Sequence, residues 1–338
     1  MADILPSICA LEDRFVREPV AHSEEYDASD ATSEFSIFHI SDRECLVMNA
    51  ISIIGLGAMG MALAKTLLNK GVKVTVWNRT STKAEPLVQN GATLAKDVLT
   101  AVQASPVALV CVSNYPTAKE ILDARGVTEA LKGKVLLQLS TGTPQEARDS
   151  ERWSSERNVD YIDGAILATP NQIGGEAGII FVSGQEAAYQ KVLPLLAHLT
   201  GNVRYLGEEV GLASTVDLAT LSFLLNALLG FYHGANIYRA EGLSVADFGT
   251  SISQLMPAID EMVRHEAEVI ESGTYESVES SVKVVVDTFE LHRQHAAEAN
   301  INADIPTAAS AIFGKAVAAG YGEQQVAALF KVLERKHE

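Results

Sequence analysis

One ionisable residue interrupts an apolar segment of the sequence, and packing alone does not explain it. Asp217 lies within GLASTVDLATL (residues 211–221), and the chain continues as LSFLLNALLGF, which is apolar enough to be buried on every side. Burial disfavours the charged form of a carboxyl group, so we expect the pKa of Asp217 to be raised and a proton-donating form to be accessible. Such a group can protonate a substrate or stabilise a cation beside it.

A structural role for Asp217 is the alternative. Ser214, Thr215, Val216 and Asp217 have the spacing of a capping box, with the acid at the third position of a helix. Aspartate fits that position less well than glutamate or glutamine, and the apolar sequence continues on both sides. The spacing alone leaves both interpretations open.

A glycine-rich turn is the second candidate site. Residues 50–80, AISIIGLGAMGMALAKTLLNKGVKVTVWNRT, predict a strand, a turn, a helix and a second strand. The GxGxxG pattern falls at the turn, where glycines allow a tight bend and a close approach of backbone N–H groups to a pyrophosphate. The helix start would face the phosphates with its positive end. The residues predicted to contact the dinucleotide here are Gly55, Leu56, Gly57, Ala58, Met59 and Gly60.

The tip of the second strand indicates which dinucleotide binds. In NAD-binding domains an acidic residue at this position bonds the ribose 2'-hydroxyl. This chain has the neutral Asn78 there. Arg79, Thr80 and Lys83 follow, and they offer two cations and a hydroxyl to a 2'-phosphate. The sequence therefore favours NADPH over NADH.

Two further apolar strands are predicted over 106–114 and 133–141, with a helix over 117–131 between them and another beginning at Thr143-Pro144. Both strands stop at small polar residues, as expected where a parallel sheet meets its ligand. The residues predicted to contact the cofactor at the first of these ends are Val112, Ser113 and Asn114.

The domain organisation follows from where the strands stop. Residues 48–206 predict an α/β Rossmann-type domain, and residues 207–338 predict an all-α domain. Residues 212–235, if helical, would form a helix of about 36 Å. Because this helix is apolar all round, it needs cover on all sides.

The first 47 residues differ from the rest, with eleven acidic residues against three arginines. They predict an acidic, disordered extension without the features of a transit or secretory peptide.

Length, charge and cysteine content limit the classes of function. The 338 residues allow two cores of roughly 150 residues each. A net charge of −17 without a dense basic stripe argues against nucleic acid and anionic lipid as partners. The sequence contains no uninterrupted apolar run of about 18 residues, so a membrane span is not expected. Cys9, Cys45 and Cys111 have no disulfide or metal-ligand spacing, so we expect no metal and a reducing, cytoplasmic location.

Several segments, in this order, resemble the imine reductase and reductive aminase branch of the β-hydroxyacid dehydrogenase superfamily. They are GLGAMGMALAKTLLNKGVKVTVWNRT, LSTGTPQEAR, GAILATP and GLASTVDLATLSFLLNALLGFYHG, and the similarity spans residues 48–335. The resemblance implies NADPH-dependent reduction of C=N bonds in a small imine or a carbonyl and amine pair. It implies catalytic roles for Asp217 and Thr141, with Ser140 and Thr141 near the nicotinamide. It also implies a long helix that joins the two domains. The same resemblance implies an intertwined homodimer whose active site lies between one subunit's Rossmann domain and the other's helices.

The resemblance also explains the sign of the charge at Asp217. Hydroxyacid dehydrogenases of the superfamily have a lysine six residues after the glycine that matches Gly211, and this chain has Asp217 there. A carboxylate stabilises a cationic iminium but not a developing alkoxide. Two rivals remain, a carbonyl or alcohol oxidoreductase of the same fold and a non-catalytic NADP-binding protein.

The chain departs from the fungal reductive aminases at three positions. Thr141 replaces an asparagine, Leu225 replaces a tyrosine eight residues after the aspartate, and Ala258 replaces a bulky aromatic residue. The resemblance therefore implies reduction of a preformed imine more strongly than condensation of a ketone with an amine. Nearby Tyr232, His233 and Tyr238 are expected to pack in a core or an interface.

Overall fold

The structure is a computed structural model that describes residues 49–276 and 280–334. The predicted acidic extension, residues 1–47, lies outside the described residues, as do Cys9 and Cys45. Cys111 is a free thiol, and burial raises its pKa to about 11.

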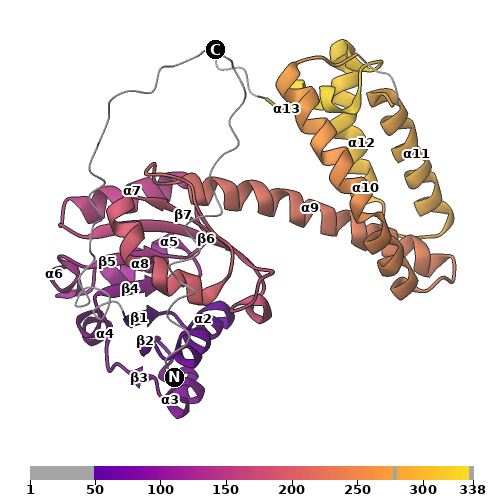
Figure 1. Ribbon diagram of the computed structural model, residues 1–338. Helices are drawn as coiled ribbons and strands as arrows, with labels where there is room; N and C mark the ends of the chain where they lie inside the picture. Colours follow the sequence, from indigo (N-terminus) through magenta and orange to yellow (C-terminus); the bar gives the residue numbers. More distant parts are fainter. Residues whose placement is uncertain (1–48, 277–279, 335–338) are drawn as a thin grey trace, which may run out of the picture. The chain divides into compact units, whose positions relative to one another are not determined.

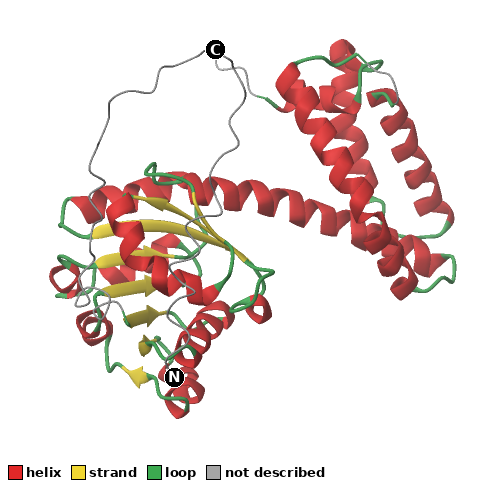
Figure 2. Cartoon of the chain, in the orientation of Figure 1, coloured by secondary structure: helices red, strands yellow, loops and turns green. Residues whose placement is uncertain are grey.

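An eight-stranded sheet forms the first part of the fold, in the order β3-β2-β1-β4-β5-β6-β7-β8 (Figures 1 and 2). Neighbouring strands are parallel except for the antiparallel pair of β6 and β7. The order reverses between β1 and β4, where open sheets of this kind bind dinucleotides. The strands are β1 (Ala50–Ile54), β2 (Lys73–Trp77), β3 (Thr93–Leu94), β4 (Val107–Val110), β5 (Val135–Gln138), β6 (Asp160–Leu167), β7 (Ile179–Gly184) and β8 (Val203–Tyr205).

Helices cover both faces of the sheet. Successive residues of a strand point to opposite faces, so the apolar strands present side chains to the helices on each side. In β4, Val107 and Leu109 enter the core under α2 and α8, whereas Ala108 and Val110 enter the core under α4 to α7. The central strands β1, β4 and β5 are thus buried on both faces, which explains their largely apolar sequences. The helices are α2 (Ala58–Asn69), α3 (Glu85–Gln89), α4 (Val98–Ala104), α5 (Tyr115–Leu122), α6 (Val127–Leu131), α7 (Pro144–Ser155) and α8 (Glu186–Leu199).

Two local predictions were wrong in extent. The single helix predicted over 117–131 is two helices, α5 and α6, because Gly126 between them adopts a positive φ of 82°. The strands predicted over 106–114 and 133–141 end at Val110 and Gln138, and the polar residues that follow form loops. The helix predicted to start at Thr143-Pro144 is confirmed, with a capping box between Thr143 and Glu146.

The second part of the fold is helical, as predicted, and in the described residues after Gly211 the only β structure is two isolated bridges. Its helices are α9 (Leu212–Ala240), α10 (Val245–Ser272), α11 (Val282–Glu298), α12 (Asp304–Ala316) and α13 (Phe330–Leu333). Helix α9 contacts β6, β7 and α7 as well as α10 and α12. It therefore joins the two parts, as the predicted helix over 212–235 was expected to do.

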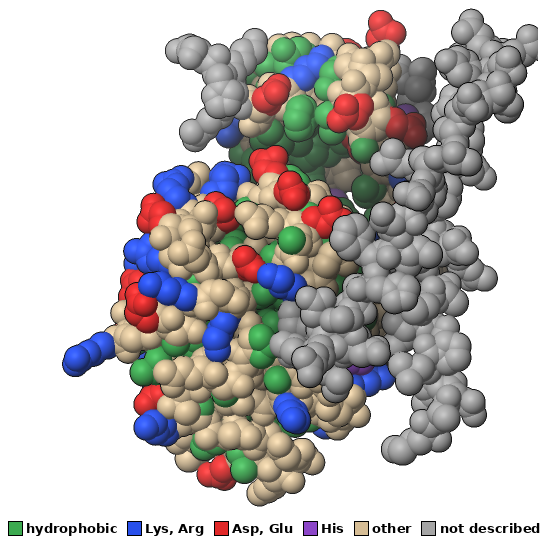
Figure 3. All heavy atoms as spheres, turned by 60° about the vertical axis from the view of Figure 1, so that its left-hand side comes forward, with side chains coloured by type: hydrophobic (Ala, Val, Ile, Leu, Met, Phe, Trp, Pro, Cys, Tyr) green, Lys and Arg blue, Asp and Glu red, His purple; other side chains and the backbone are tan. Residues whose placement is uncertain are grey.

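Helix α9 exposes much of its apolar surface. The large apolar side chains that are 37–56% exposed on this helix are Leu218, Phe223, Leu224, Leu225, Leu228, Leu229 and Tyr232. Figure 3 shows further apolar side chains gathered on the upper part of the molecule, beside acidic ones. By length and composition alone, α9 would also suit a membrane span, and 17% of its most apolar window is buried. This surface requires cover from something outside the described residues.

The close approach of helix and strand at the glycine loop gives a stability prediction. A Cβ atom on Gly60 would lie 2.1 Å from the backbone oxygen of Gly55, whereas one on Gly57 would meet no atom within 4 Å. Helix propensity alone favours Gly60→Ala by about 1 kcal/mol, but the overlap with rigid backbone outweighs it. We expect Gly60→Ala to lower the free energy of unfolding by about 1–3 kcal/mol.

Gly57→Ala is the matched control and should change the stability by less than about 0.5 kcal/mol. Chemical denaturation of both variants measures the difference. Equal stabilities would contradict the proposed close contact at Gly60.

Candidate active site

The start of α2 is a backbone site suited to an anion. Gly57 is the N-cap of α2, and the first turn has neither a side-chain cap nor an acidic residue. The N–H groups of Ala58, Met59 and Gly60 are the first amides of the helix, which have no partner within the helix itself. The space above Gly57 is open. A pyrophosphate fits this loop because these amides and the helix dipole both favour negative charge.

Asn78 joins the glycine loop to the basic turn after β2. Its Oδ1 accepts a hydrogen bond from the backbone N–H of Leu56 at 3.0 Å, and its Nδ2 donates to the carbonyl of Thr80 at 2.9 Å. The amide of Leu56 is therefore already used, so a cofactor contact by Leu56 has to come from other atoms.

The exposed cations Arg79 and Lys83 follow in this turn, and in the described part of the chain neither forms an ion pair. They fit a phosphate better than a neutral hydroxyl.

The ends of β4 and β5 meet beside the glycine loop. The backbone N–H of Cys111 donates to the carbonyl of Ile54 at 2.9 Å, which places the residues after β4 against those after β1. Ser140 is buried, and its Oγ accepts from the N–H of Val112 at 3.0 Å. The Oδ1 of Asn114 caps α5 by accepting from the N–H of Thr117. Ser113 lies next to Asn114, with its Oγ 3.4 Å from that of Thr117.

The capping-box interpretation of Asp217 is wrong. Helix α9 begins at its N-cap Gly211, so Asp217 lies in the second turn rather than at a third helical position. The Ser214 hydroxyl does not cap this helix but donates to Oδ2 of Asp163 at 3.0 Å. The capping alternative fails because the left-handed Gly211 starts the helix three residues earlier than the box requires.

Asp217 is a buried carboxyl group that shares a site with Thr141. It is 4% exposed, and its side chain is hydrogen-bonded to Thr141 in the loop after β5. Burial raises the pKa of Asp217, and the nearby charge of Asp163 raises it further, while the bond to Thr141 opposes the rise. The direction is the one expected from the apolar sequence around this residue. The structure thus brings together the two residues predicted to be catalytic.

A second buried carboxyl group, Asp163 on β6, lies at the centre of a hydrogen-bond network. Its Oδ1 accepts from the Tyr115 hydroxyl at 2.5 Å, and its Oδ2 accepts from the Ser214 backbone N–H at 3.2 Å as well as from the Ser214 hydroxyl. The Gly211 backbone also bonds it. Ser183, the cross-strand partner of Asp163, accepts from the N–H of Ala213 at 3.2 Å. Side chains of β6 and β7 therefore satisfy the first amides of α9.

Asp163 was not among the residues predicted from the sequence. The signal was present in VDYIDGAIL, where an ionisable residue interrupts a strand that is otherwise buried. The same question that singles out Asp217 applies to this position, because a buried acid needs a partner or a function.

The other polar residues near α9 mainly pack. His233 is buried against His292, and Tyr238 packs against Phe248 in a tilted arrangement with ring centroids 4.7 Å apart. Tyr232 is exposed, as are Leu225 and Ala258, the two α-helical positions that differ from the fungal reductive aminases.

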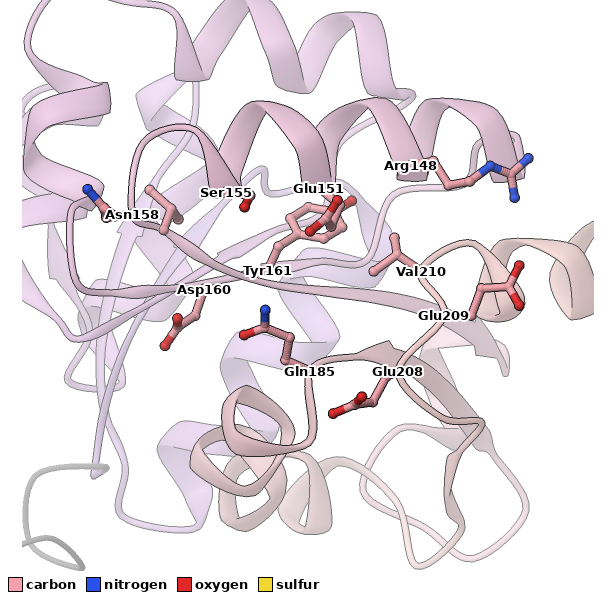
Figure 4. Close-up of a pocket in the computed structure, with 11 residues that line it drawn as sticks. Arg148, Glu151, Ser155, Asn158, Asp160, Tyr161, Gln185, Glu208, Glu209 and Val210 are labelled. Atoms are coloured by element: carbon pink, nitrogen blue, oxygen red, sulfur yellow. The ribbon is translucent and has the colours of Figure 1, made fainter.

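One cavity of the described residues lies away from the cofactor loop. Its volume is about 550 Å³, and it lies between α7, the start of β6 and the loop before α9 (Figure 4). Its lining includes the acidic residues Glu151, Asp160, Glu208 and Glu209, but neither the glycine loop nor Asp217. This cavity is therefore separate from the candidate active site.

Comparisons with known proteins agree with this geometry. The family model for the NAD-binding domain of 6-phosphogluconate dehydrogenase matches residues 50–207. The model for the C-terminal domain of NADPH-dependent reductive aminase-like proteins matches residues 209–335. An NADPH-dependent reductive aminase of Aspergillus oryzae is 31% identical over 288 residues, which are 83% of this chain and 96% of that protein.

Two solved structures are similar over 84% of the chain. The imine reductase from Myxococcus stipitatus in complex with NADP+ has 34% identity and a TM-score of 0.80, with 100% of that chain covered. The reductive aminase from Aspergillus terreus in complex with NADPH and ethyl levulinate has 32% identity and a TM-score of 0.79, with 99% of that chain covered. Because family models match both parts of the fold and these relatives are more than 30% identical over most of the chain, the chain belongs to the imine reductase and reductive aminase family.

Proposed function

We propose that this protein is an NADPH-dependent oxidoreductase that reduces C=N bonds to amines. The observation that supports this most directly is the buried carboxyl group of Asp217, hydrogen-bonded to Thr141 in the loop after β5. That loop emerges from the same carboxyl edge of the sheet as the glycine loop. A proton donor is thus held at the edge where the nicotinamide of a dinucleotide would lie.

The cofactor residues have separate tasks in this proposal. The amides of Ala58, Met59 and Gly60 bind the pyrophosphate, and Arg79 and Lys83 bind the 2'-phosphate. Asn78 holds these two parts together through its bonds to Leu56 and Thr80. Bound NADPH supplies the hydride, whereas this chain supplies position and charge.

The charge at Asp217 separates imine from carbonyl chemistry. Reduction of a C=O bond builds negative charge on oxygen, which a neighbouring carboxylate destabilises. Reduction of an iminium starts from positive charge on nitrogen, which the carboxylate form attracts and which the protonated form produces by proton transfer. Asp217 therefore favours C=N over C=O as the reacting group, and it disfavours the carbonyl oxidoreductase alternative.

The substrate proposed is a small imine that is formed before it binds. The reductive aminase from Aspergillus terreus has been solved with NADPH4, cyclohexanone and allyl amine, a ketone and amine pair. In this chain Thr141 keeps a hydroxyl beside Asp217, but Leu225 has no polar group. The absence of a polar group at Leu225 weakens the case for condensing a ketone with an amine in the site. It weakens the case for reducing a preformed imine less.

The homodimer is part of the proposal, because the exposed apolar face of α9 must be covered by a partner. A second copy presents the same apolar face, so the two are self-complementary. A bilayer is the weaker choice because α10, the next helix, carries Asp260, Glu261, Glu266, Glu268 and Glu271, and anionic lipid repels acids. In this proposal the second copy also completes the site beside Asp217. The free thiol of Cys111 suits the proposed cytoplasmic location.

The basic turn gives the first functional prediction. Arg79→Ala should raise the dissociation constant of NADPH about 10- to 100-fold, because a charged hydrogen bond to phosphate is lost, and should leave that of NADH unchanged. Fluorescence titration of both cofactors measures this. Lys73→Ala is the control, since this exposed lysine lies at the opposite end of β2. Equal losses for both cofactors would contradict a 2'-phosphate contact.

The second functional prediction concerns Asp217. Asp217→Asn keeps the size of the side chain but removes its proton, so kcat for a cyclic imine should fall about 10²- to 10⁴-fold while NADPH binds normally. The measurement is NADPH oxidation, alongside titration of cofactor binding and assays with 2- and 3-hydroxy acids. Turnover close to that of the wild type, or a preference for hydroxy acids, would contradict imine chemistry at this residue.

The third prediction concerns the dimer. Leu225 is 56% exposed on α9, and Leu225→Glu should convert a dimer into a monomer that binds NADPH but does not turn over. Val88→Glu, at an exposed apolar residue of α3, should leave the dimer intact. Sedimentation gives the mass of each. A monomeric wild type, or a wild type that partitions into lipid vesicles, would count against a second copy as the occupant.

A further inference from the structure

The two buried carboxyl groups, Asp163 and Asp217, belong to one site. Asp163 accepts from the N–H and the hydroxyl of Ser214, and Ser214 lies three residues before Asp217 on α9. Residues three apart on a helix share a face. Both side chains are buried, and the charge of Asp163 acts on Asp217. Two carboxylates that close, in a site removed from water, do not readily ionise together.

The donors around the pair are divided unequally. Asp163 accepts from the Tyr115 hydroxyl, from both groups of Ser214 and from the backbone of Gly211. It also lies at the N-terminus of α9, where the helix dipole stabilises an anion. Asp217 has one donor, Thr141, and lies one turn further along the helix. Burial raises the pKa of both carboxyl groups, whereas hydrogen bonds to a carboxylate favour its ionised form. Because Asp163 accepts more of these bonds than Asp217, Asp163 is the better placed of the two to hold the negative charge.

We propose that Asp163 and Asp217 act as one carboxyl pair, in which Asp163 holds the negative charge and Asp217 holds the proton that passes to the substrate nitrogen. Asp163 is a positioning residue in this pair, since it acts on the substrate only through Asp217. The inference rests on the proposed function and adds the group that keeps its acid protonated.

The proton balance of the step is simple. The O–H bond of Asp217 breaks as an N–H bond forms on the substrate nitrogen, and the substrate carbon receives the hydride. Asp217 is left as a carboxylate beside ionised Asp163, and their repulsion favours the return of a proton from water. The pair therefore both stores the proton before the reaction and promotes its replacement afterwards.

Other titratable groups around the pair do not supply a competing charge within ion-pair distance. Tyr115 from α5 and Tyr161 from β6 remain protonated, because burial raises the pKa of each phenol. From α7, Arg148 approaches Gly211 and Glu151 acts on Tyr161. Helix α9 and the β5–α7 loop contribute Ser214 and Thr141, which are neutral. In the described part of the chain, neither Asp163 nor Asp217 forms an ion pair.

The test replaces the anion of the pair without changing its shape. Asp163→Asn removes the negative charge beside Asp217, so the pH at which Asp217 titrates should fall by at least about one unit. The midpoint moves to lower pH whether Asp217 works as a proton donor or as an anion. In both cases one limb of the pH–rate profile follows the titration of Asp217. The pH dependence of kcat/KM for a cyclic imine measures the shift. Asp160→Asn, on the same strand but in a surface ion pair with Lys191, should leave it unchanged.

Infrared titration of the carboxyl bands, assigned by the band that Asp217→Asn removes, gives the same midpoint without turnover. An inactive wild type would thus defeat the proposed function but would still leave the pair measurable. An unchanged Asp217 midpoint in folded Asp163→Asn would overturn the pair while leaving the proposed function intact.

A second variant covers the case in which Asp163→Asn does not fold. Tyr115→Phe removes one donor from Asp163, which makes its anion less stable and should also move the Asp217 midpoint to lower pH, by a smaller amount. In a folded double variant with Asp163→Asn, the tyrosine change should add no further shift, because the hydroxyl acts through the carboxylate. A Tyr115→Phe midpoint equal to that of the wild type would overturn the proposal.

Discussion

The carboxylate of Asp163 is the constraint on which the rest of the site depends. A carboxyl group that is fully removed from water needs its hydrogen-bond donors in place, since an unpaired buried charge is far more costly than an exposed one. Its donors come from α5 and from the first turn of α9, while the residue itself lies on β6. Satisfying this one group therefore fixes the cofactor-side helix, the sheet and the interdomain helix against one another. Because Asp217 lies on α9, this arrangement also fixes its position.

The site separates charge along the edge of the sheet. Cations and uncapped amides gather at the dinucleotide end, around Arg79, Lys83 and the start of α2. Acidic groups gather at the start of α9, around Asp163 and Asp217. In a chain with a net charge of −17, a basic cluster here fits the proposed binding of an anionic cofactor. The acidic end suits a substrate that becomes cationic, so both ends of the site favour the same reaction.

Much of the fold could be predicted from the sequence because its signals are local. The GxGxxG turn lies between an apolar strand and a helix, and that context specifies the first βαβ unit and the position of the cofactor loop. The all-helical second part follows from the loss of strand patterns after Gly211. The lengths of the elements were harder to predict, since an apolar run does not show where hydrogen bonding ends; a turn at Gly126 divides one predicted helix into two.

The buried network was not predicted, because its contacts are between residues far apart in the sequence. Asp163 meets Tyr115 and Ser214 across 48 and 51 residues, and no spacing rule connects them. The capping-box interpretation failed for the same reason, as the partner of Ser214 lies on a strand and not in its own helix. Burial of Asp217, by contrast, could be predicted from the apolar residues on both sides of it.

A crystal structure of the full chain with NADP+ and an amine product would test the central claim most directly, through the distance between the Asp217 carboxyl group and the amine nitrogen. We predict a hydrogen bond of about 2.7–3.2 Å, in a pocket whose second wall comes from another copy of the chain. An amine bound to another residue, with Asp217 turned away from the nicotinamide, would contradict it.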